Sequence, residues 1–291
     1  MKVLVTGANG QLGHDVVNEL RSRGHETITT DIAGEMDYLL DITQPDVVDA
    51  VRKISPDAII HCAAWTAVDA AEDTENKEKV YAINVTGTEN LVKAAEYLDC
   101  KFLYLSTDYV FDGQGDRPWK PDDKAYAPLC YYGETKLAGE KAVSELEKYF
   151  IVRIAWVFGL NGKNFIKTMI DVGKKHEEVR VVNDQIGTPT YTFDLARLLV
   201  DMIETEKYGY YHATNEGGFI SWYDFCEEIY KQAGLKTKVV PVTTLEYGLS
   251  KAKRPFNSRL DKSKLSENGF ERLPEWKDAL HRYLIEIGYG K

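Results

Sequence analysis

A glycine-rich turn directly follows the first β-branched run of the chain. Residues 2–7 read KVLVTG, and Gly7, Gly10 and Gly13 follow one another at intervals of three. Apolar residues then recur at every fourth position until Gly24, which is typical of an amphipathic helix that ends at a glycine. This order of strand, glycine turn and helix constrains the fold more than any other feature. It predicts a β–α unit in which the N-terminus of the helix faces the end of a strand.

The first half of the chain continues to alternate strand and helix patterns. Continuous apolar runs, such as those at 58–64 and 150–159, are separated by amphipathic segments such as 44–55 and about 78–99. Strands that are apolar on both faces belong to parallel sheets covered by helices on both sides. We therefore predict an α/β fold with a doubly wound, Rossmann-type parallel sheet. Ligands of such sheets bind beyond the carboxyl ends of the strands.

The spacing of the three glycines predicts a dinucleotide site in the first β–α unit. A tight turn lets the backbone approach a pyrophosphate, and the N–H groups and dipole of the helix N-terminus favour phosphates. Asp31 ends the second predicted strand, where a carboxylate can accept hydrogen bonds from the adenosine ribose. Because it repels a 2′-phosphate, we expect NADH as cofactor, with NADPH as the alternative. An aspartate that only caps the turn is the competing interpretation.

A tyrosine and a lysine lie one helical turn apart in the segment YYGETK. Tyr132 and Lys136 share one helix face, whereas the residue at that spacing from Tyr131 is uncharged. A nearby ammonium stabilises a phenolate and so equips a tyrosine for proton transfer. In the preceding strand end, LSTDY, the hydroxyl of Ser106 or Thr107 can bind a carbonyl oxygen. The combination predicts hydride transfer at a carbonyl carbon with Tyr132 as acid or base.

Composition excludes several other classes of function. The chain has 291 residues and a net charge of −10, so it lacks the basic field of a nucleic-acid or anionic-membrane binder. The six histidines show no ligand spacing, and we expect no metal site. No signal peptide or long apolar run is evident, and no cysteines form a CxxC pair, so we expect a reducing cytoplasm. The four cysteines, expected as free thiols, are Cys62, Cys100, Cys130 and Cys226.

These motifs resemble the extended short-chain dehydrogenase/reductase superfamily and, within it, the dTDP-4-dehydrorhamnose reductase family. The resemblance runs over nearly the whole chain, in the segments VTGANGQLG, HCAAWTAVDAAE, INVTGTENL, LSTDYVFDG, YGETKLAGEK, VRIAWVFG, GKNFIKTM, VNDQIGTPTYTFDLA and KRPFNSRLDKSKL. It implies an NAD(P)H-dependent enzyme of dTDP-rhamnose and cell-surface polysaccharide synthesis. Such an enzyme reduces the C4 ketone of dTDP-4-dehydrorhamnose.

The resemblance also implies roles for individual residues. The catalytic set is Thr107, Tyr132 and Lys136. The cofactor-binding set is Gly7, Gly10, Gln11, Leu12, Gly13, Asp31, Asp41, Ile42, Ala63, Ala64, Trp65, Tyr132 and Lys136. The substrate-binding set is Thr107, Asp108, Trp156 and Arg254. The implied partner is a small nucleotide sugar, and a homo-oligomer remains open.

The second half of the chain has shorter elements, more aromatic residues and a polar segment at 251–265. We predict an NAD(H)-binding Rossmann domain over residues 1–158, to which a segment at about 184–215 returns. Residues 159–291 are expected to form mainly a second, smaller α/β substrate-binding domain.

Alternative interpretations remain at three points. Sugar-nucleotide 4,6-dehydratases carry an acidic pair after the threonine, and Tyr109 in the second of these positions disfavours dehydration. A reductase of another nucleotide-linked 4-keto-deoxysugar, or a non-catalytic NAD-binding regulatory subunit, would share much of the sequence. Trp156 can stack on the substrate or fill the core, and Arg254 can bind the diphosphate or be a surface charge.

Overall fold

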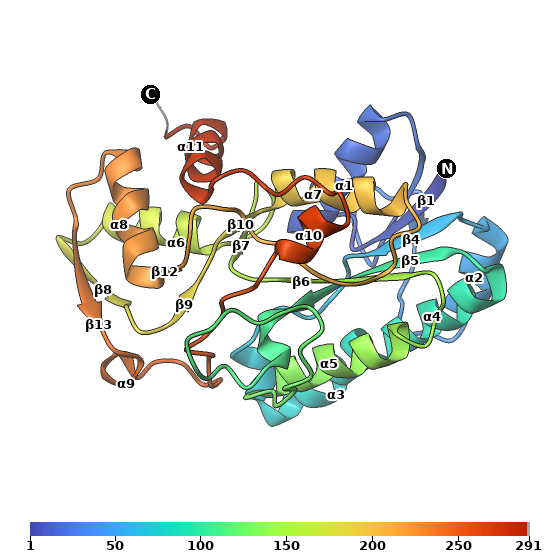
Figure 1. Cartoon of the computed structure of the whole chain (residues 1–291), viewed down its shortest axis with the longest axis horizontal. Helices are drawn as coiled ribbons and strands as arrows, with labels where there is room; N and C mark the ends of the chain where they lie inside the picture. Colours follow the sequence, from blue (N-terminus) through green and yellow to red (C-terminus); the bar gives the residue numbers. More distant parts are fainter. Residues whose placement is uncertain (290–291) are drawn as a thin grey trace.

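The computed structural model describes residues 1–289, and a parallel sheet crosses its first part (Figure 1). Within these residues the sheet has seven strands in the order β11-β6-β5-β4-β1-β2-β3. Their bounds are β1 (Lys2–Thr6), β2 (Glu26–Asp31), β3 (Tyr38–Leu39), β4 (Ala58–His61), β5 (Lys101–Thr107), β6 (Tyr149–Ile154) and β11 (Gly209–His212). The order reverses between β1 and β4, so the carboxyl ends of these strands flank the crevice where such sheets bind ligands. The predicted doubly wound α/β fold is confirmed.

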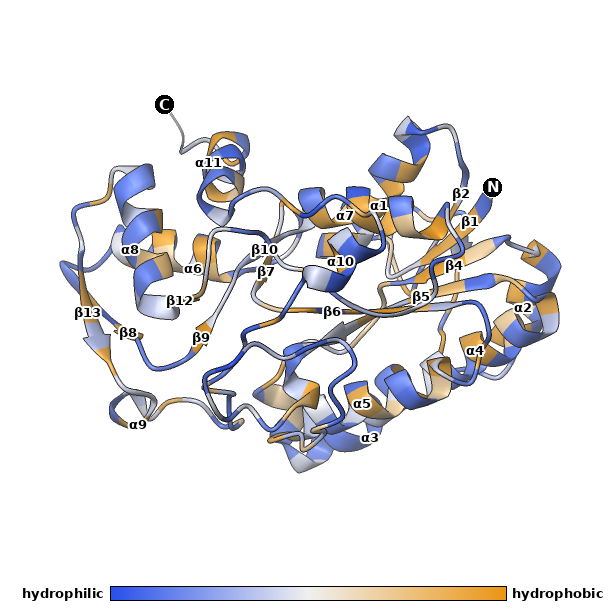
Figure 2. Ribbon diagram, viewed as in Figure 1, coloured by the Kyte–Doolittle hydropathy of each residue, from blue (hydrophilic) through white to orange (hydrophobic). Residues whose placement is uncertain are grey.

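Helices cover both faces of this sheet. Their bounds are α1 (Gln11–Ser22), α2 (Val47–Ile54), α3 (Lys77–Tyr81), α4 (Gly87–Leu98), α5 (Tyr131–Val143) and α7 (Thr192–Ile203). Val3 and Val5 of β1 pack with α1 and α7, whereas Leu4 packs with α2 and α4 on the opposite face. Figure 2 shows hydrophobic residues along the strands and on the helix surfaces turned toward them. Burial on both faces explains why these strands are continuous apolar runs.

The helical segment expected at about 78–99 differs from a single regular helix. Its middle, Ala82–Thr86, is a π-helical turn between α3 and α4. Asn84 lies in this turn, and its side chain forms hydrogen bonds with two other segments. Its Oδ1 accepts the Trp65 N–H at 2.8 Å, and its Nδ2 donates to Thr135 Oγ1 at 3.0 Å. The turn therefore links the segment after β4 to α5.

The second part of the molecule has its own core beside the sheet (Figure 1). Its elements are β7 (Val157–Phe158), α6 (Phe165–Gly173), β8 (Glu178–Val182), β9 (Ile186–Gly187), β10 (Thr190–Tyr191), β12 (Ile220–Ser221), α8 (Trp222–Ala233), β13 (Lys238–Val242), α9 (Thr244–Tyr247) and α11 (Trp276–Glu286). α10 (Ser263–Glu267) packs instead against β11, with Leu265 in the core of the large sheet. β8 pairs with β13 in parallel, and α6, α8 and α11 enclose aromatic residues. The chain returns to the large sheet between these elements, where α7 packs on α1 and β11 pairs with β6.

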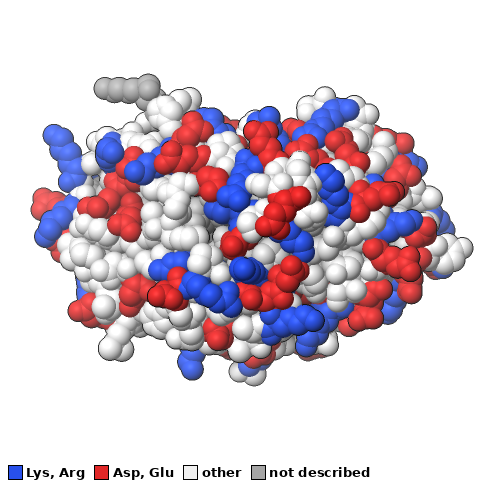
Figure 3. Space-filling model, viewed as in Figure 1, with Lys and Arg blue, Asp and Glu red and all other residues white. Residues whose placement is uncertain are grey.

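The surface carries charges of both signs. Over the face in Figure 3, Lys and Arg side chains are interspersed with Asp and Glu. Across residues 1–289, no helix is long and apolar enough to cross a membrane. The same residues contain no group of three or more His, Cys, Asp or Glu side chains that could hold a metal ion. All four cysteines are free thiols.

Candidate active site

Two neighbouring cavities lie at the carboxyl ends of the parallel strands. The first cavity, of about 340 Å³, is lined mainly by residues that follow β1, β2 and β4. The second cavity, of about 430 Å³, is lined mainly by residues from β5, α5 and the segment after β6. Gly10, Cys62 and Ala64 line both cavities. The two cavities thus form one groove across the point where the strand order reverses.

The glycine turn forms the floor between the two cavities. Gly7 has a φ of 65°, and a Cβ there would lie 2.6 Å from the Ala63 nitrogen. A Cβ on Gly13 would lie 2.1 Å from the Gly7 carbonyl oxygen, so this helix–strand contact also requires glycine. Gly10 is the N-cap residue of α1. The turn therefore aims the N-terminus of α1 into the groove, where Gln11 and Leu12 line the second cavity.

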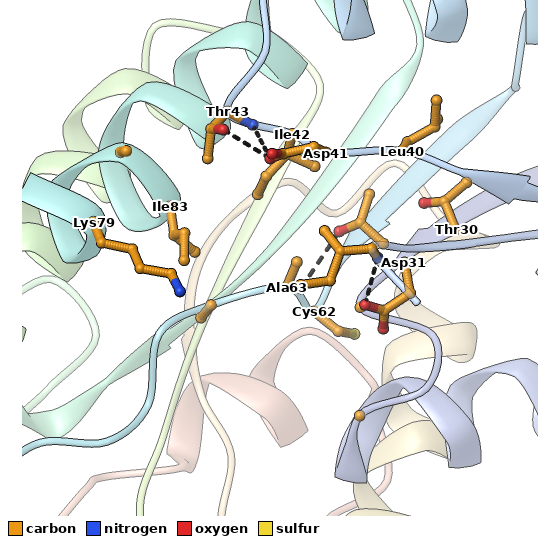
Figure 4. A pocket seen from close by; sticks show the side chains of 16 residues that line it. Thr30, Asp31, Leu40, Asp41, Ile42, Thr43, Cys62, Ala63, Lys79 and Ile83 are labelled. Atoms are coloured by element: carbon orange, nitrogen blue, oxygen red, sulfur yellow. Dashed lines mark hydrogen bonds between the residues drawn. The ribbon is translucent and has the colours of Figure 1, made fainter. Parts of the chain in front are cut away.

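Acidic side chains mark the outer end of the first cavity, as Figure 4 shows. Asp31 ends β2, and its two carboxylate oxygens accept the N–H groups of Asn9 at 3.1 Å and Ile32 at 2.7 Å. Asp41 accepts both the N–H and the hydroxyl of Thr43, at 2.9 and 2.7 Å. Burial raises the pKa of Asp41, but the hydrogen bonds from Thr43 outweigh it and leave the pKa lowered. Both carboxylates are therefore held in place as hydrogen-bond acceptors by nearby residues.

The first cavity also contains a residue that sequence reasoning missed. Lys79 of α3 lines it, together with the expected Ile42 and Ala63 (Figure 4). No local pattern points to Lys79, because it lies far along the chain from Asp31 and reaches the cavity only through the packing of α3. Trp65, a predicted cofactor contact, lines neither cavity.

Thr107, Tyr132 and Lys136 all line the second cavity. Thr107 ends β5, while the other two lie one turn apart in α5. Tyr131 does not line this cavity: its hydroxyl donates to the Lys77 carbonyl at 3.3 Å, and its N–H donates to Glu72 at 2.7 Å. Helical spacing thus separates the two adjacent tyrosines as expected.

The protonation states in the second cavity follow from burial. Lys136 is 3% exposed, and burial lowers its pKa to about 7 against the opposing effects of Glu140 and Cys62. Its ammonium lies 4.0 Å from the centre of the Tyr104 ring. Burial and the Asp108 carboxylate raise the pKa of Tyr132, whereas the Thr107 hydroxyl lowers it. The Tyr132 phenol therefore holds its proton at neutral pH, which suits a proton donor.

Two buried polar atoms on the wall of the second cavity have no hydrogen-bond partner in the described structure: Ser106 Oγ and Asp108 Oδ2. Burial raises the pKa of Asp108 to about 6, against the opposing effect of nearby hydroxyls, of which that of Thr107 donates to Asp108 Oδ1 at 3.0 Å. A buried polar group without a partner costs free energy, so these two atoms lower the stability of this part of the wall.

His61 is a further residue that the sequence left unassigned. It lines the second cavity, and its ring nitrogens lie 2.7 Å from Thr6 Oγ1 and 3.1 Å from Thr88 Oγ1. Burial and the charge of Lys136 lower its pKa to about 3, so the ring is neutral. His61 thus adds no positive charge near the phenol.

Trp156 stands at the rim of the second cavity in a left-handed conformation, with a φ of 51°. Its indole stacks on Trp222 of α8 with ring centres 3.8 Å apart. Both indoles line the cavity, so Trp156 is neither simply buried in the core nor isolated on the surface. Lys163 lines the same cavity.

Arg254 lies apart from the other predicted substrate residues. It lines a third cavity of about 370 Å³, on the other side of Trp222. Its guanidinium donates to Asp69 at 2.7 Å and to the Tyr109 hydroxyl at 3.2 Å. The predicted positive charge is therefore already paired, and Arg254 is held between the segment after β4 and the wall of the second cavity.

A protonated phenol beside a buried amine, in a cavity continuous with a dinucleotide-type groove, is the arrangement of a nicotinamide-dependent oxidoreductase. A family model described as the RmlD substrate binding domain matches residues 1–288. Relatives named dTDP-4-dehydrorhamnose reductase also match almost the whole chain, so the chain belongs to the dTDP-4-dehydrorhamnose reductase family.

The relatives cover almost the entire chain. A dTDP-4-dehydrorhamnose reductase of Escherichia coli K12 is 39% identical over 99% of this chain and 98% of its own length. The spore coat polysaccharide biosynthesis protein SpsK of Bacillus subtilis is 38% identical over 98% of this chain and 97% of its own. A crystal structure of dTDP-4-dehydrorhamnose reductase from Bacillus anthracis, in complex with NADP, is 43% identical. It has a TM-score of 0.91 and covers 98% of this chain and 100% of that one.

Proposed function

We propose that this enzyme reduces the C4 ketone of dTDP-4-dehydrorhamnose to dTDP-L-rhamnose, with NADH as the reductant and NADPH as the alternative. The observation that carries the proposal is the convergence of Thr107, Tyr132 and Lys136 on one cavity continuous with the glycine turn. The names of the relatives support the substrate.

The first cavity fits an adenine dinucleotide. Asp31 is placed to accept hydrogen bonds from the ribose, Asp41 and Ile42 to flank the adenine, and the N-terminus of α1 to bind the pyrophosphate. Ala63 and Ala64 offer a small-residue wall on the path to the second cavity. When bound, the nicotinamide supplies the hydride.

The residues of the second cavity would handle the proton and the carbonyl oxygen. The Thr107 hydroxyl, which donates to Asp108 Oδ1 at 3.0 Å, would turn to donate to the carbonyl oxygen, and Tyr132 would protonate that oxygen as negative charge develops. Lys136 offers an ammonium to the ribose and to the phenolate that remains. Asp108 and Trp156, which both line this cavity, are the contacts that we propose for the sugar nucleotide.

Two other functions would use part of the same site. A different nucleotide-linked 4-keto-deoxysugar could occupy the second cavity, since the chemistry at C4 is the same. A non-catalytic NAD-binding subunit would need the first cavity and no acid–base set. The full set of three catalytic side chains favours turnover.

The test is the loss of NADH absorbance with dTDP-4-dehydrorhamnose, compared across a panel of keto sugar nucleotides and both reduced cofactors. Tyr132→Phe should lower kcat by about 10²–10⁴-fold, because the proton donor is lost. Tyr131→Phe is the matched control, since that hydroxyl lies outside the cavity, and it should retain the wild-type rate. Equal rates in wild type and Tyr132→Phe, or no turnover of any keto sugar by wild type, would refute the proposal.

A further inference from the structure

A fully buried ion pair lies just behind the second cavity. Arg153 of β6 and Glu140 of α5 are 0% and 1% exposed. The guanidinium donates from Nε and Nη2 to the two carboxylate oxygens, both at 2.8 Å. Burying two charges costs several kcal/mol that the pair's attraction often fails to regain, so such a pair is weak evidence for a role in stability.

The pair joins the two elements that carry the catalytic side chains. Glu140 lies one helical turn beyond Lys136 on α5. Arg153 pairs in the sheet with Ser106, the residue before Thr107. A shift of either partner would therefore move the lysine relative to the threonine.

The positive end of the pair has its own partners. Arg153 Nη1 donates to the Pro121 carbonyl at 3.0 Å, and Nη2 donates to the Tyr126 hydroxyl at 3.0 Å. The His212 ring lies 3.4 Å from Nη1 and is neutral, because burial and Arg153 hold its pKa well below the usual value. Arg153 is thus tied to the 121–126 segment and to β11, which leaves Glu140 as the member that acts on Lys136.

Besides Asp108 after β5, which acts on Tyr132, and Lys163, few charged groups share the second cavity with Lys136. The titratable groups that face it from β4, β5 and α5 are His61, Cys62, Tyr104, Tyr132 and Glu140. His61 is neutral, and burial raises the pKa of Cys62 to about 12, so that thiol keeps its proton. Both tyrosines have raised pKa values because they are buried. Among these groups, the Glu140 carboxylate, which is paired with Arg153, provides the counter-charge to Lys136.

We propose that Glu140 is a positioning residue for the reaction: anchored by Arg153, it fixes α5 against β6 and provides the counter-charge for the buried Lys136 ammonium. This role rests on the proposed reductase function, in which Lys136 acts as an ammonium. It explains why a costly buried pair stands one turn behind the catalytic lysine rather than an apolar contact.

The first test measures Lys136 directly, without substrate or cofactor. In protein labelled with ¹³C at the lysine Cε, the Lys136 signal is identified by its loss in Lys136→Arg and followed with pH. Glu140→Gln should move its titration to lower pH by about one unit, because the carboxylate no longer favours the ammonium. An unchanged Lys136 titration would overturn the proposal, whatever the activity.

The second test separates charge from folding. Glu140→Leu with Arg153→Met replaces the pair by apolar side chains of similar size, an exchange that buried pairs often tolerate. The folded double variant should still lose kcat/KM at a lower pH than wild type, since Lys136 loses its charge earlier. A wild-type pH profile in this variant, or loss of fold in both variants, would assign the pair to stability alone.

A second ion pair provides the matched control. Arg282 donates from both terminal nitrogens to Asp194, each at 2.8 Å, far from the groove. Asp194→Asn should lower stability and leave both the Lys136 titration and the pH profile unchanged. A similar shift in this variant would mean that general loosening, not Glu140, controls the lysine.

Discussion

The two cavities of the groove differ in how their polar side chains are paired. In the first cavity, Asp31 accepts the N–H groups of Asn9 and Ile32, and Asp41 accepts the N–H and hydroxyl groups of Thr43. In the second, Lys136 is buried with its pKa lowered to about 7, and Asp108 keeps one oxygen without a partner. The two carboxylates of the first cavity are thus hydrogen-bonded by the protein itself, whereas the second cavity holds buried polar groups that the protein pairs only in part.

The two cavities therefore differ in how much their polar groups cost the stability of the fold. Satisfied acceptors cost little, so the first cavity can be preformed without strain. Buried groups that lack partners destabilise the fold, and they concentrate where they can be used in catalysis. We therefore expect substitutions in the second cavity to change activity and stability, and substitutions in the first cavity to change mainly cofactor binding.

The largest effect in this comparison is expected from the two adjacent hydroxyls of the second cavity. Thr107→Val should lower kcat/KM by about 10²–10³-fold, because the carbonyl oxygen loses a hydrogen-bond donor. Ser106→Ala removes the neighbouring hydroxyl, which has no partner in the described structure, and should cost less than tenfold. Steady-state rates with the keto sugar nucleotide measure both. A larger loss of kcat/KM in Ser106→Ala than in Thr107→Val would mean that Ser106, and not Thr107, binds the carbonyl oxygen.

Much of the groove could be predicted from the sequence because its determinants are local. The three glycines of the turn lie close together in the sequence, and the spacing that distinguishes Tyr132 from Tyr131 spans a single helical turn. The pairing of Arg254 with Asp69 and the stacking of Trp156 on Trp222 join distant segments. Such contacts depend on how the second part packs on the sheet, and this packing cannot be predicted from the periodicity of apolar residues.

The same limit applies to buried charges. His61, Arg153 and Glu140 lie within elements that were predicted correctly as strand or helix. Their pairing across the sheet and α5 could not be predicted, since it depends on register and helix orientation. The raised pKa of Asp108 likewise follows from its burial, which depends on tertiary packing and not on a local pattern.

We expect the ionised Asp108 side chain to lower the free energy of unfolding. Its pKa is raised by burial to about 6, above its usual value, so the ionised form weakens the fold above that pH. This cost is at most about 3 kcal/mol at pH 7 and disappears as the pH falls toward 4. Asp108→Asn should therefore unfold at higher urea than wild type at pH 7, with a smaller difference at pH 5, while its KM for the sugar nucleotide rises. A variant that is less stable than wild type at pH 7 would contradict the comparison.

The smallest effect is expected in the first cavity. Asp31→Ala should raise the KM for NADH by about tenfold, the loss of roughly one charge-assisted hydrogen bond. The KM for NADPH should rise less or fall, because the carboxylate no longer repels the 2′-phosphate. Lys79→Ala is the companion variant: its ammonium lines the same cavity, and its loss should weaken NADPH more than NADH. The ratio of the two KM values is the decisive measurement, since a turn that is merely loosened would weaken both cofactors equally. Equal changes in Asp31→Ala would mean that this carboxylate serves only to hold the N–H groups of Asn9 and Ile32.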